Sequence, residues 1–369
     1  MAPTELLARQ HADTIHGLLK PLGLEKQVVL LVGSLSPAQK TKARAAIASG
    51  HAGFIIGTQA LIQEQVDMHK LALIIIDEQH RFGVEQRKTL MAKAGHMPHV
   101  LSLTATPIPR SLALTLYGEL DISVLDEKPV GRQAIKTEIV SPNSRAQLYE
   151  SIDKQLDEGK QMFVVCPLIT DSTVLDAAAA EQVYQQLAQK DFKHRRVGLL
   201  HGKLKPTDKQ SIMEQFVCHE LDILVSTTVI EVGVDVPNAN IMLIESAERF
   251  GLAQLHQLRG RVGRSSDQGH CYLLLSDSSA PTRRMRALSS SNDGFKLAEL
   301  DLEIRGPGAI YGTSQHGQLD LRIAKLTDTK LIAAARAAAH KLLDQNENLL
   351  QYKHLMKNVN RLRTVTNLN

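Results

Sequence analysis

The chain has 369 residues, of which 43% are hydrophobic and 22% charged, and a formal net charge of +4. This length allows two domains with full cores, because single domains commonly have about 100–200 residues. No apolar run reaches the roughly 20 residues of a membrane span, and the first residues lack a secretion signal, so we expect a cytoplasmic protein without a membrane partner. The three cysteines, Cys166, Cys218 and Cys271, are too far apart for a C-x-x-C zinc or redox motif and are expected to be buried, reduced thiols.

The distribution of charge is more informative than its sum. Residues 323–369 carry eight Lys/Arg against three Asp/Glu, and Arg259, Arg261 and Arg264 lie within six residues of one another. Clustered basic groups are compatible with contacts to nucleic-acid or nucleotide phosphates.

Short β-branched runs alternate with helical patterns in the first part of the chain. We expect a helix from Ser36 to Ser49, with Ser36 as the N-cap and Pro37 in the first turn. Strands are expected at 27–33, 53–58, 71–76 and 99–106. This alternation predicts a parallel sheet with helices on both faces.

The pattern is interrupted at 126–133, a segment with Pro and Gly and no periodicity, and then restarts. Further strands are expected at 161–166, 195–200, 222–227, 240–246 and 269–275, with helices near 176–190, 205–217 and 252–259. We therefore predict two similar α/β lobes facing a cleft, a first lobe at 1–127 and a second lobe at 128–280. Helical pieces broken by Gly and Pro follow at 281–325, and a helical tail at 326–369.

An acidic segment follows the apolar run "LALIII" at 71–76. Ligands of open α/β sheets bind beyond the carboxyl ends of the strands, where Asp77 and Glu78 are expected. Asp77 there can hold Mg²⁺, and Glu78 can orient and deprotonate a water molecule. Gln79 and His80 add polar groups directed at the same ligand. The alternative is that the two acids cap and charge the start of the next helix.

A turn rich in arginine, "HQLRGRVGR" at 256–264, forms the second candidate site. Gln257, Arg261 and Arg264 lie on it, and the two arginines are three residues apart, on nearly the same face. Their guanidinium groups suit bidentate contacts with phosphate oxygens and can act as arginine fingers on a γ-phosphate. A solvated basic turn is the alternative.

A third group of candidates lies at strand ends, where hydroxyls and free N–H groups can contact phosphates or relay a signal between sites. The threonines of this group are Thr4, Thr58, Thr104, Thr106, Thr227 and Thr228. Gly233 and Asp235 lie in the loop that follows the last two, and Asp235 can bond a sugar hydroxyl or the arginine turn. Ordinary capping and turn formation are the alternative for each threonine.

In this order the segments resemble the motifs of superfamily 2 helicases. "APTE" at 2–5, "GTQAL" at 57–61, "DEQH" at 77–80, "TAT" at 104–106, "TTVIEVGVDVP" at 227–237 and "QLRGRVGR" at 257–264 match motifs Ia, Ib, II, III, V and VI. The form "DEQHRFG" and the segment at 293–317 are similar to the RecG family of ATP-dependent DNA helicases. The second of these segments resembles the translocation motif that RecG shares with Mfd.

The resemblance implies an α/β fold of two RecA-like lobes with parallel sheets, the first incomplete at its N-terminus, plus a C-terminal helical hairpin and tail. It implies ATP and Mg²⁺ at Asp77 and Glu78, completed by Gln257, Arg261 and Arg264. Thr104 and Thr106 would couple this site to DNA, and the segment around Arg305 and Gln315 would move duplex DNA.

The function that the resemblance implies is the remodelling of stalled forks and Holliday junctions in recombination and repair. DNA is the expected partner, with a single-stranded-DNA-binding protein as a further candidate. We expect a monomer in the bacterial cytoplasm, associated with the nucleoid.

The sequence departs from this family pattern in one important respect. It contains no G-x-x-x-x-G-K-[ST] loop, which RecG-like proteins carry just upstream of "APTE", and no wedge domain. The chain is therefore expected to correspond to the C-terminal part of such a helicase and to be inactive alone. The alternatives are a non-catalytic DNA-binding remnant and an Mfd-like translocase, since "QHG" at 315–317 resembles the Mfd form.

Overall fold

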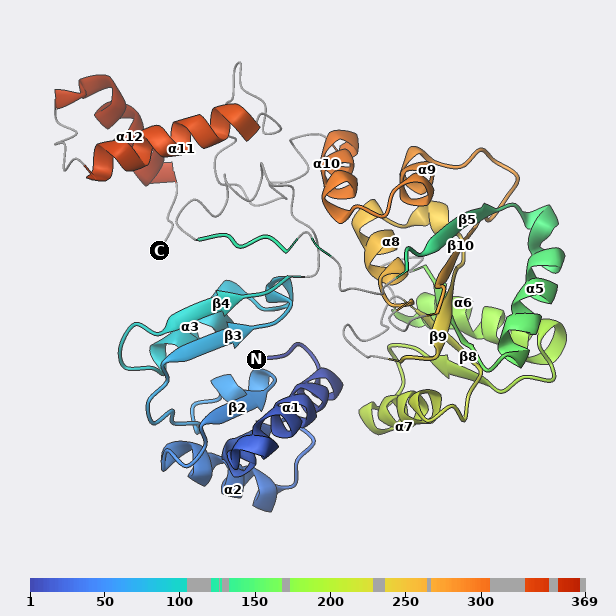
Figure 1. The fold of residues 1–369 in the computed structure, drawn as a ribbon, viewed down its shortest axis with the longest axis horizontal. Coiled ribbons are helices and arrows are strands. Elements are labelled where there is room, and N and C mark those ends of the chain that lie inside the picture. The colour runs from blue at the N-terminus through green and yellow to red at the C-terminus, as the bar shows by residue number, and fades with distance from the viewer. Residues whose placement is uncertain are drawn as a thin grey trace. The chain divides into compact units, whose positions relative to one another are not determined.

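The computed structural model describes residues 1–104, 121–125, 127, 133–167, 173–227, 236–263, 267–305, 329–344 and 351–365 (Figure 1). One compact unit comprises Met1–Thr106, Arg132–Arg249 and Gln257–Ala280, and a second comprises Pro107–Gly131, Phe250–His256 and Pro281–Asn369. The predicted boundaries at 127, 280 and 325 stay predictions. Within the described ranges, none of the helices is long and apolar enough to cross a bilayer.

Four short strands of the first lobe form two two-stranded parallel sheets. β1 (Val28–Leu31) pairs in parallel with β2 (Phe54–Gly57), and β3 (Leu73–Ile76) pairs in parallel with β4 (His99–Ser102). The backbone of residues 1–2 joins the two pairs. The N–H of Ala2 donates to Gly57 O at 2.8 Å, and the N–H of Asp77 donates to Met1 O at 3.0 Å. The strand ends that carry the candidate residues therefore lie along one edge.

Three helices accompany these strands in the chain: α1 (Glu5–Leu19) before β1, α2 (Pro37–Ala48) between β1 and β2, and α3 (Val84–Ala92) between β3 and β4. Leu7, Ala8 and Ala12 of α1 pack in one apolar cluster with β2, and Ala43 and Ile47 of α2 pack in another with β1. The predicted start of α2 is confirmed. The Ser36 hydroxyl accepts the N–H of Gln39 at 3.3 Å, and the Ser36 N–H donates to the Gln39 side chain at 3.0 Å, which forms a capping box.

The second lobe contains a six-stranded parallel sheet in the order β5-β10-β9-β6-β8-β7. Its strands are β5 (Lys136–Val140), β6 (Gln161–Cys166), β7 (Val197–Leu200), β8 (Ile223–Thr227), β9 (Ala239–Ile244) and β10 (His270–Leu274). Every residue of β6, β8 and β9 is buried. Such continuous burial explains why these strands read as unbroken apolar runs in the sequence.

The helices of this lobe are α5 (Arg145–Asp157), α6 (Thr173–Gln186), α7 (Pro206–Val217) and α8 (Leu252–Arg259). Ile152 of α5 packs in the main core with Val164 of β6. Phe216 of α7 contacts Phe163, with ring centroids 4.8 Å apart. Because Phe163 and Val164 are consecutive in a strand, these contacts lie on opposite faces of the sheet.

Helices alone follow the second lobe among the described residues: α9 (Arg283–Ser290), α10 (Gly294–Arg305), α11 (Thr329–Asp344) and α12 (Lys353–Val365). The Thr282 hydroxyl caps α9 by accepting the N–H of Met285 at 3.3 Å. Arg283 of α9 forms an ion pair with Glu303 of α10 at 3.5 Å. Of the predicted linker at 126–133, only residues 127 and 133 are among the described residues. The segment at 306–328 lies entirely outside them.

All nine predicted strands are present, and α2, α6, α7 and α8 lie where helices were predicted. The prediction omitted β5, "KTEIV", which begins with three polar residues and in which more and less exposed side chains alternate. β5 lies at the edge of the sheet, where partial exposure removes the continuous apolar run. The three cysteines are free thiols, as predicted, and Cys166 and Cys271 are buried. The prediction that all three are buried is wrong for Cys218, which is exposed.

Candidate active site

Asp77 follows β3 directly and is held from two sides. One carboxylate oxygen, Oδ1, accepts the N–H of Glu78 at 2.9 Å, and the other, Oδ2, lies 3.2 Å from Nε2 of His11 on α1. The hydrogen bond with His11 holds the pKa of Asp77 below its ordinary value, against the opposing effect of burial. The side chain is still 26% exposed. Asp77 is therefore an ionised carboxylate that a ligand can reach.

Glu78 adopts a left-handed backbone conformation, with φ of 48°, and is only 4% exposed. Its Oε2 lies 3.6 Å from Nδ1 of His80, in the 3-10 helix Gln79–Arg81. The N–H of Gln79 donates to Leu103 O at 3.0 Å, directly before Thr104. The acidic segment and the end of β4 are thus joined by a hydrogen bond.

The acids fit magnesium in the way that nucleotide-binding sites use it. Among the described residues, no three His, Cys, Asp or Glu side chains are grouped as a metal cage. Magnesium at such sites is commonly held by one or two carboxylates, with water and substrate phosphates as the other ligands. An ionised, partly exposed Asp77 with Glu78 beside it suits that arrangement, whereas a metal held by protein ligands alone would not fit.

The threonines differ in what their hydroxyls do. Thr4 caps α1 by accepting the N–H of Leu7 at 3.3 Å, which is the capping role considered above. Thr58 precedes the 3-10 helix Gln59–Ile62 without a capping side-chain bond. Thr227 ends β8 at 2% exposure, and its buried Oγ1 has no hydrogen-bond partner in the described part of the chain.

Gln257 and Arg261 lie at the end of α8 and in the turn that follows, and both are half-buried. The N–H of Arg261 donates to Leu258 O at 3.0 Å, which continues the helical winding into the turn. Gly263 then takes φ of 67°, and a Cβ there would lie 3.3 Å from Cα of Gly269. A left-handed conformation and a close backbone neighbour both favour glycine at this position.

Arg259 differs from the cluster of exposed arginines that the sequence suggested. It is 2% exposed, and burial lowers its pKa. Cys271 of β10 lies near enough to influence it electrostatically, and burial raises the pKa of that thiol to about 12. Arg259 is therefore a structural residue of the second lobe, which leaves Arg261 as the described arginine of this turn that a phosphate can approach.

Several predicted site residues lie outside the described residues. They are Thr106, Thr228, Gly233, Asp235, Arg264 and Gln315. Arg305 is the last residue of α10, and the structure describes its backbone but not its side chain. The structure brings Asp77, Glu78, Gln79, His80 and the end of β4 together, whereas Gln257 and Arg261 belong to the other lobe and are described separately.

Sequence reasoning missed two basic residues, His11 and Arg145, whose side chains contact strand-end acids. His11 contacts Asp77, and Arg145 forms an ion pair with Glu245, the residue after β9. The only signal for His11 was its spacing from Thr4, since residues seven apart on a helix share a face. Glu245 was recognisable as an acid directly after an apolar run, like Asp77.

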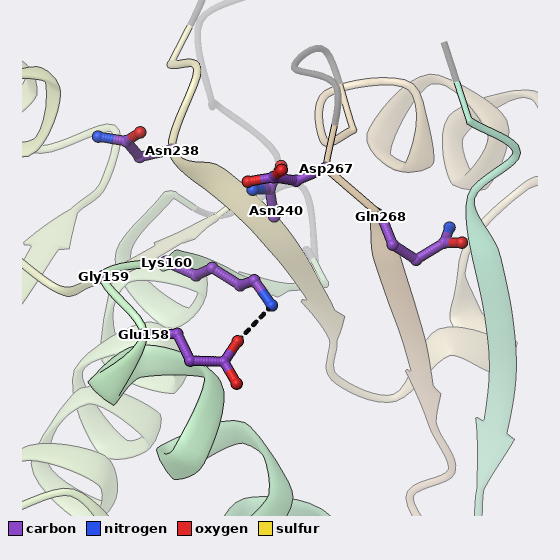
Figure 2. A pocket seen from close by; sticks show the side chains of 7 residues that line it. All are labelled: Glu158, Gly159, Lys160, Asn238, Asn240, Asp267 and Gln268. Carbon is purple, nitrogen blue, oxygen red and sulfur yellow. Dashed lines mark hydrogen bonds and ion pairs between the residues drawn. The ribbon is translucent and has the colours of Figure 1, made fainter. Parts of the chain in front are cut away.

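A polar pocket of about 410 Å³ opens at the amino ends of β6, β9 and β10. Its lining comprises Glu158, Gly159, Lys160, Asn238, Asn240, Asp267 and Gln268 (Figure 2). Lys160 Nζ forms an ion pair with Glu158 Oε2 at 2.7 Å. None of the predicted site residues lines this pocket.

Three protein-family models match consecutive parts of the chain. The DEAD/DEAH box helicase model matches residues 1–115, and the helicase conserved C-terminal domain model matches residues 144–266. A model described as ATP-dependent DNA helicase RecG, domain 3, C-terminal, matches residues 291–368.

Curated relatives give the same result. The chain is 48% identical over 351 residues to the ATP-dependent DNA helicase RecG of Synechocystis, covering 95% of this chain and 42% of the relative. It is 50% identical over 336 residues to RecG of Escherichia coli K12, covering 88% and 48%. The chain thus spans about half the length of the curated relatives it matches.

A solved structure of RecG bound to a three-way DNA junction is also similar, with a TM-score of 0.68 and 42% identity over 90% of this chain and 43% of that one. A solved structure of the helicase MrfA bound to DNA is similar in fold alone, with a TM-score of 0.56 and 20% sequence identity. The match covers 76% of this chain and 42% of that one. From the consecutive family matches and the high identity to curated relatives, we conclude that the chain belongs to the RecG family of helicases.

Proposed function

We propose that the chain carries the acidic, arginine and DNA-contacting parts of an ATP-driven helicase that remodels branched DNA. The ionised carboxylate of Asp77, partly exposed at the carboxyl end of β3, carries this proposal, in a chain whose three consecutive parts match helicase models. The similarity to a RecG structure bound to a three-way junction supports branched DNA as the substrate.

In the nucleotide site Asp77 would hold Mg²⁺, which neutralises phosphate charge when bound. Glu78 would accept a proton from the attacking water, and its burial beside His80 favours a carboxylate with a fixed orientation. Gln79 and His80 would sense the nucleotide. Gln257, Arg261 and Arg264 would contact its phosphates from the second lobe, with Gly233 and Asp235 in the neighbouring loop.

The DNA-contacting residues would be the threonines at strand ends. Thr58 supports this role, because its side chain is partly exposed and makes no capping bond. Thr227 is only 2% exposed, so DNA could reach its hydroxyl only after a local rearrangement. Thr4, Thr104, Thr106 and Thr228 would contribute similarly, and Arg305 and Gln315 would belong to the moving hairpin. A single-stranded-DNA-binding protein as partner, a monomeric state and a nucleoid location remain predictions.

One sequence observation favours a second candidate function for these 369 residues: DNA binding without ATP hydrolysis. The chain has no G-x-x-x-x-G-K-[ST] loop, whose lysine and backbone N–H groups cradle the β- and γ-phosphates. We therefore expect that the purified chain binds DNA and hydrolyses ATP only at background rate.

The test measures binding and hydrolysis with one preparation. Fluorescence anisotropy with a labelled three-way junction, and with a linear duplex of equal length, should show tighter binding to the junction. Affinity should fall steeply between about 50 and 200 mM salt, because phosphate contacts release counterions. Equal affinity for both DNAs would remove the branched-DNA proposal, and DNA-stimulated hydrolysis abolished by Glu78→Gln would show that this chain turns over ATP alone.

A further inference from the structure

The acidic segment of the first lobe has a counterpart in the second lobe. Residues 76–86 read "IDEQHRFGVEQ", and residues 244–254 read "IESAERFGLAQ". Both begin with the last isoleucine of a strand, continue with an acid, and share Arg-Phe-Gly followed by a glutamine three positions later. We call residues 77–83 and 245–251 the first and second RFG loops.

The two loops also share their backbone conformation. The second residue of each loop is left-handed, with φ of 48° at Glu78 and 48° at Ser246. A three-residue 3-10 helix follows in both, Gln79–Arg81 and Ala247–Arg249. In each the arginine N–H donates to the carbonyl oxygen of the left-handed residue, at 2.8 Å in the first loop and 3.0 Å in the second. The sequence likeness is therefore a structural repeat.

Each RFG loop leads directly into a helix in the same way. The glycine N–H donates to the glutamine side-chain oxygen three residues later, at 3.2 Å from Gly83 to Gln86 and 3.1 Å from Gly251 to Gln254. The phenylalanine before the glycine is buried in both. α3 follows the first loop and α8 follows the second. The loop therefore sets where a helix begins.

The two loops differ in how their acids are bound. Asp77 is 26% exposed and meets a histidine at 3.2 Å. Glu245 is 12% exposed and forms an ion pair with Arg145, whose guanidinium also lies 5.7 Å from the ring centroid of Tyr149. Burial raises the pKa of Glu245. Glu245 is thus bound within the lobe, whereas Asp77 remains available to a ligand.

Two further differences separate the second loop from a catalytic site. Ser246 stands where the first loop has Glu78, so the second loop has no carboxylate to activate water. Glu248 of the second loop has both carboxylate oxygens buried without a hydrogen-bond partner in the described residues. Burial and, less strongly, the neighbouring Glu248 raise the pKa of Glu245, and the guanidinium of Arg145 opposes both effects.

We infer that the second RFG loop is a positioning element for the arginine turn, held in place by the ion pair of Arg145 and Glu245. α8 starts at Leu252, directly after this loop, and ends at the turn that carries Arg261. Arg145 and Glu245 are accordingly positioning residues, and neither contacts a substrate. The role in catalysis rests on the proposed function, whereas the positioning of α8 does not.

Hydrogen–deuterium exchange with mass spectrometry tests this inference on the 369-residue chain. Arg145→Met should accelerate exchange at residues 246–262 by about tenfold or more, because the anchoring of the loop is lost. Arg145→Lys keeps the positive charge and should restore part of the protection. The matched control is Arg196→Met, which removes a 2.6 Å ion pair with Asp222 elsewhere in the lobe. That variant should leave residues 246–262 unchanged.

Two outcomes would overturn the inference. One is unchanged exchange at residues 246–262 in folded Arg145→Met. The other is equal acceleration throughout β6 and β8, which would make the ion pair a general stabiliser of the lobe. If Arg145→Met does not fold, Glu245→Gln takes its place, because it preserves shape and one acceptor while removing the charge. Failure of the wild-type chain to bind DNA or nucleotide would reject the proposed function and leave this exchange test intact.

Discussion

His11 and Asp77 lie 66 residues apart in the sequence, and their side chains meet with Nε2 3.2 Å from Oδ2. A helix of the first lobe thereby fixes the orientation of the carboxylate that we assign to magnesium. Since the other carboxylate oxygen accepts a backbone N–H, the plane of the carboxylate is held at both oxygens. The carboxylate therefore has its orientation before any ligand binds.

The first prediction concerns the pKa of Asp77. His11→Ala removes the hydrogen bond that stabilises the ionised carboxylate, so the pKa of Asp77 should rise. Because the folded-state pKa lies below the unfolded one, this contact stabilises the protein above the unfolded pKa, and that stability is lost as pH falls through the folded pKa. Carboxyl ¹³C NMR titration measures the change, with Asp77→Asn to assign the signal. His16→Ala on the exposed side of α1 is the control, and an unchanged pKa in His11→Ala would contradict the prediction.

The second prediction concerns the left-handed residue of the second RFG loop. Ser246→Gly should be more stable to urea than Ser246→Ala by about 1 kcal/mol, because alanine at positive φ carries a steric penalty that glycine does not. Ala45→Gly on the exposed face of α2 is the control. Glycine should destabilise by about 1 kcal/mol there, in the interior of a helix. If alanine were more stable than glycine at position 246, as it is expected to be at position 45, Ser246 would not be constrained in the left-handed region.

The third prediction separates conformation from packing in the arginine turn. Gly263→Ala places a Cβ 3.2 Å from Ile135 Cγ1 and 3.3 Å from Gly269 Cα, at φ of 67°. Gly159→Ala meets the same positive-φ penalty, at 86°, in open space. Urea unfolding should show a larger loss for Gly263→Ala, by about 1–3 kcal/mol, because the backbone of Gly269 must move. Equal losses would mean that the turn tolerates the added methyl group.

The fourth prediction concerns Thr227. Its buried Oγ1 has no hydrogen-bond partner among the described residues, so Thr227→Val should leave stability unchanged or raise it by up to about 1 kcal/mol. Anisotropy with the three-way junction should show weaker binding if this hydroxyl contacts DNA. Thr4→Ala gives the contrast, because it removes a helix cap and should cost about 1 kcal/mol in urea unfolding. Unchanged DNA affinity in Thr227→Val would remove Thr227 from the proposed contacts.

The sequence predicted the strands well because buried parallel strands are continuous apolar runs, as in "QMFVVC" of β6. It predicted the position of Asp77 for the same reason, since the acid ends such a run. It missed β5, whose edge position permits three polar residues in a strand of five. The partners of the strand-end acids were also missed, because pairs such as Arg145 and Glu245, 100 residues apart, depend on how helices pack rather than on local spacing.

The RFG repeat illustrates a different limit. Its letters were present in the sequence, but only the matching φ angles of Glu78 and Ser246 show that the two segments adopt one conformation. The likeness also explains why an acid after a strand does not by itself indicate a catalytic site. Glu245 has the position of Asp77, but its carboxylate is already engaged in an ion pair with Arg145.

The joining of two strand pairs by residues 1–2 has a practical consequence for anyone who handles this protein. The amino group of Met1 donates to Ile75 O at 2.6 Å, and burial lowers its pKa. An affinity tag or fluorophore attached to the amino group of Met1 would have to pass between the two strand pairs and would replace an amine with an amide. Exposed Cys218, in the second lobe, is a better position for a label. The position at which a label is most easily attached is thus, in this molecule, hydrogen-bonded between two strand pairs.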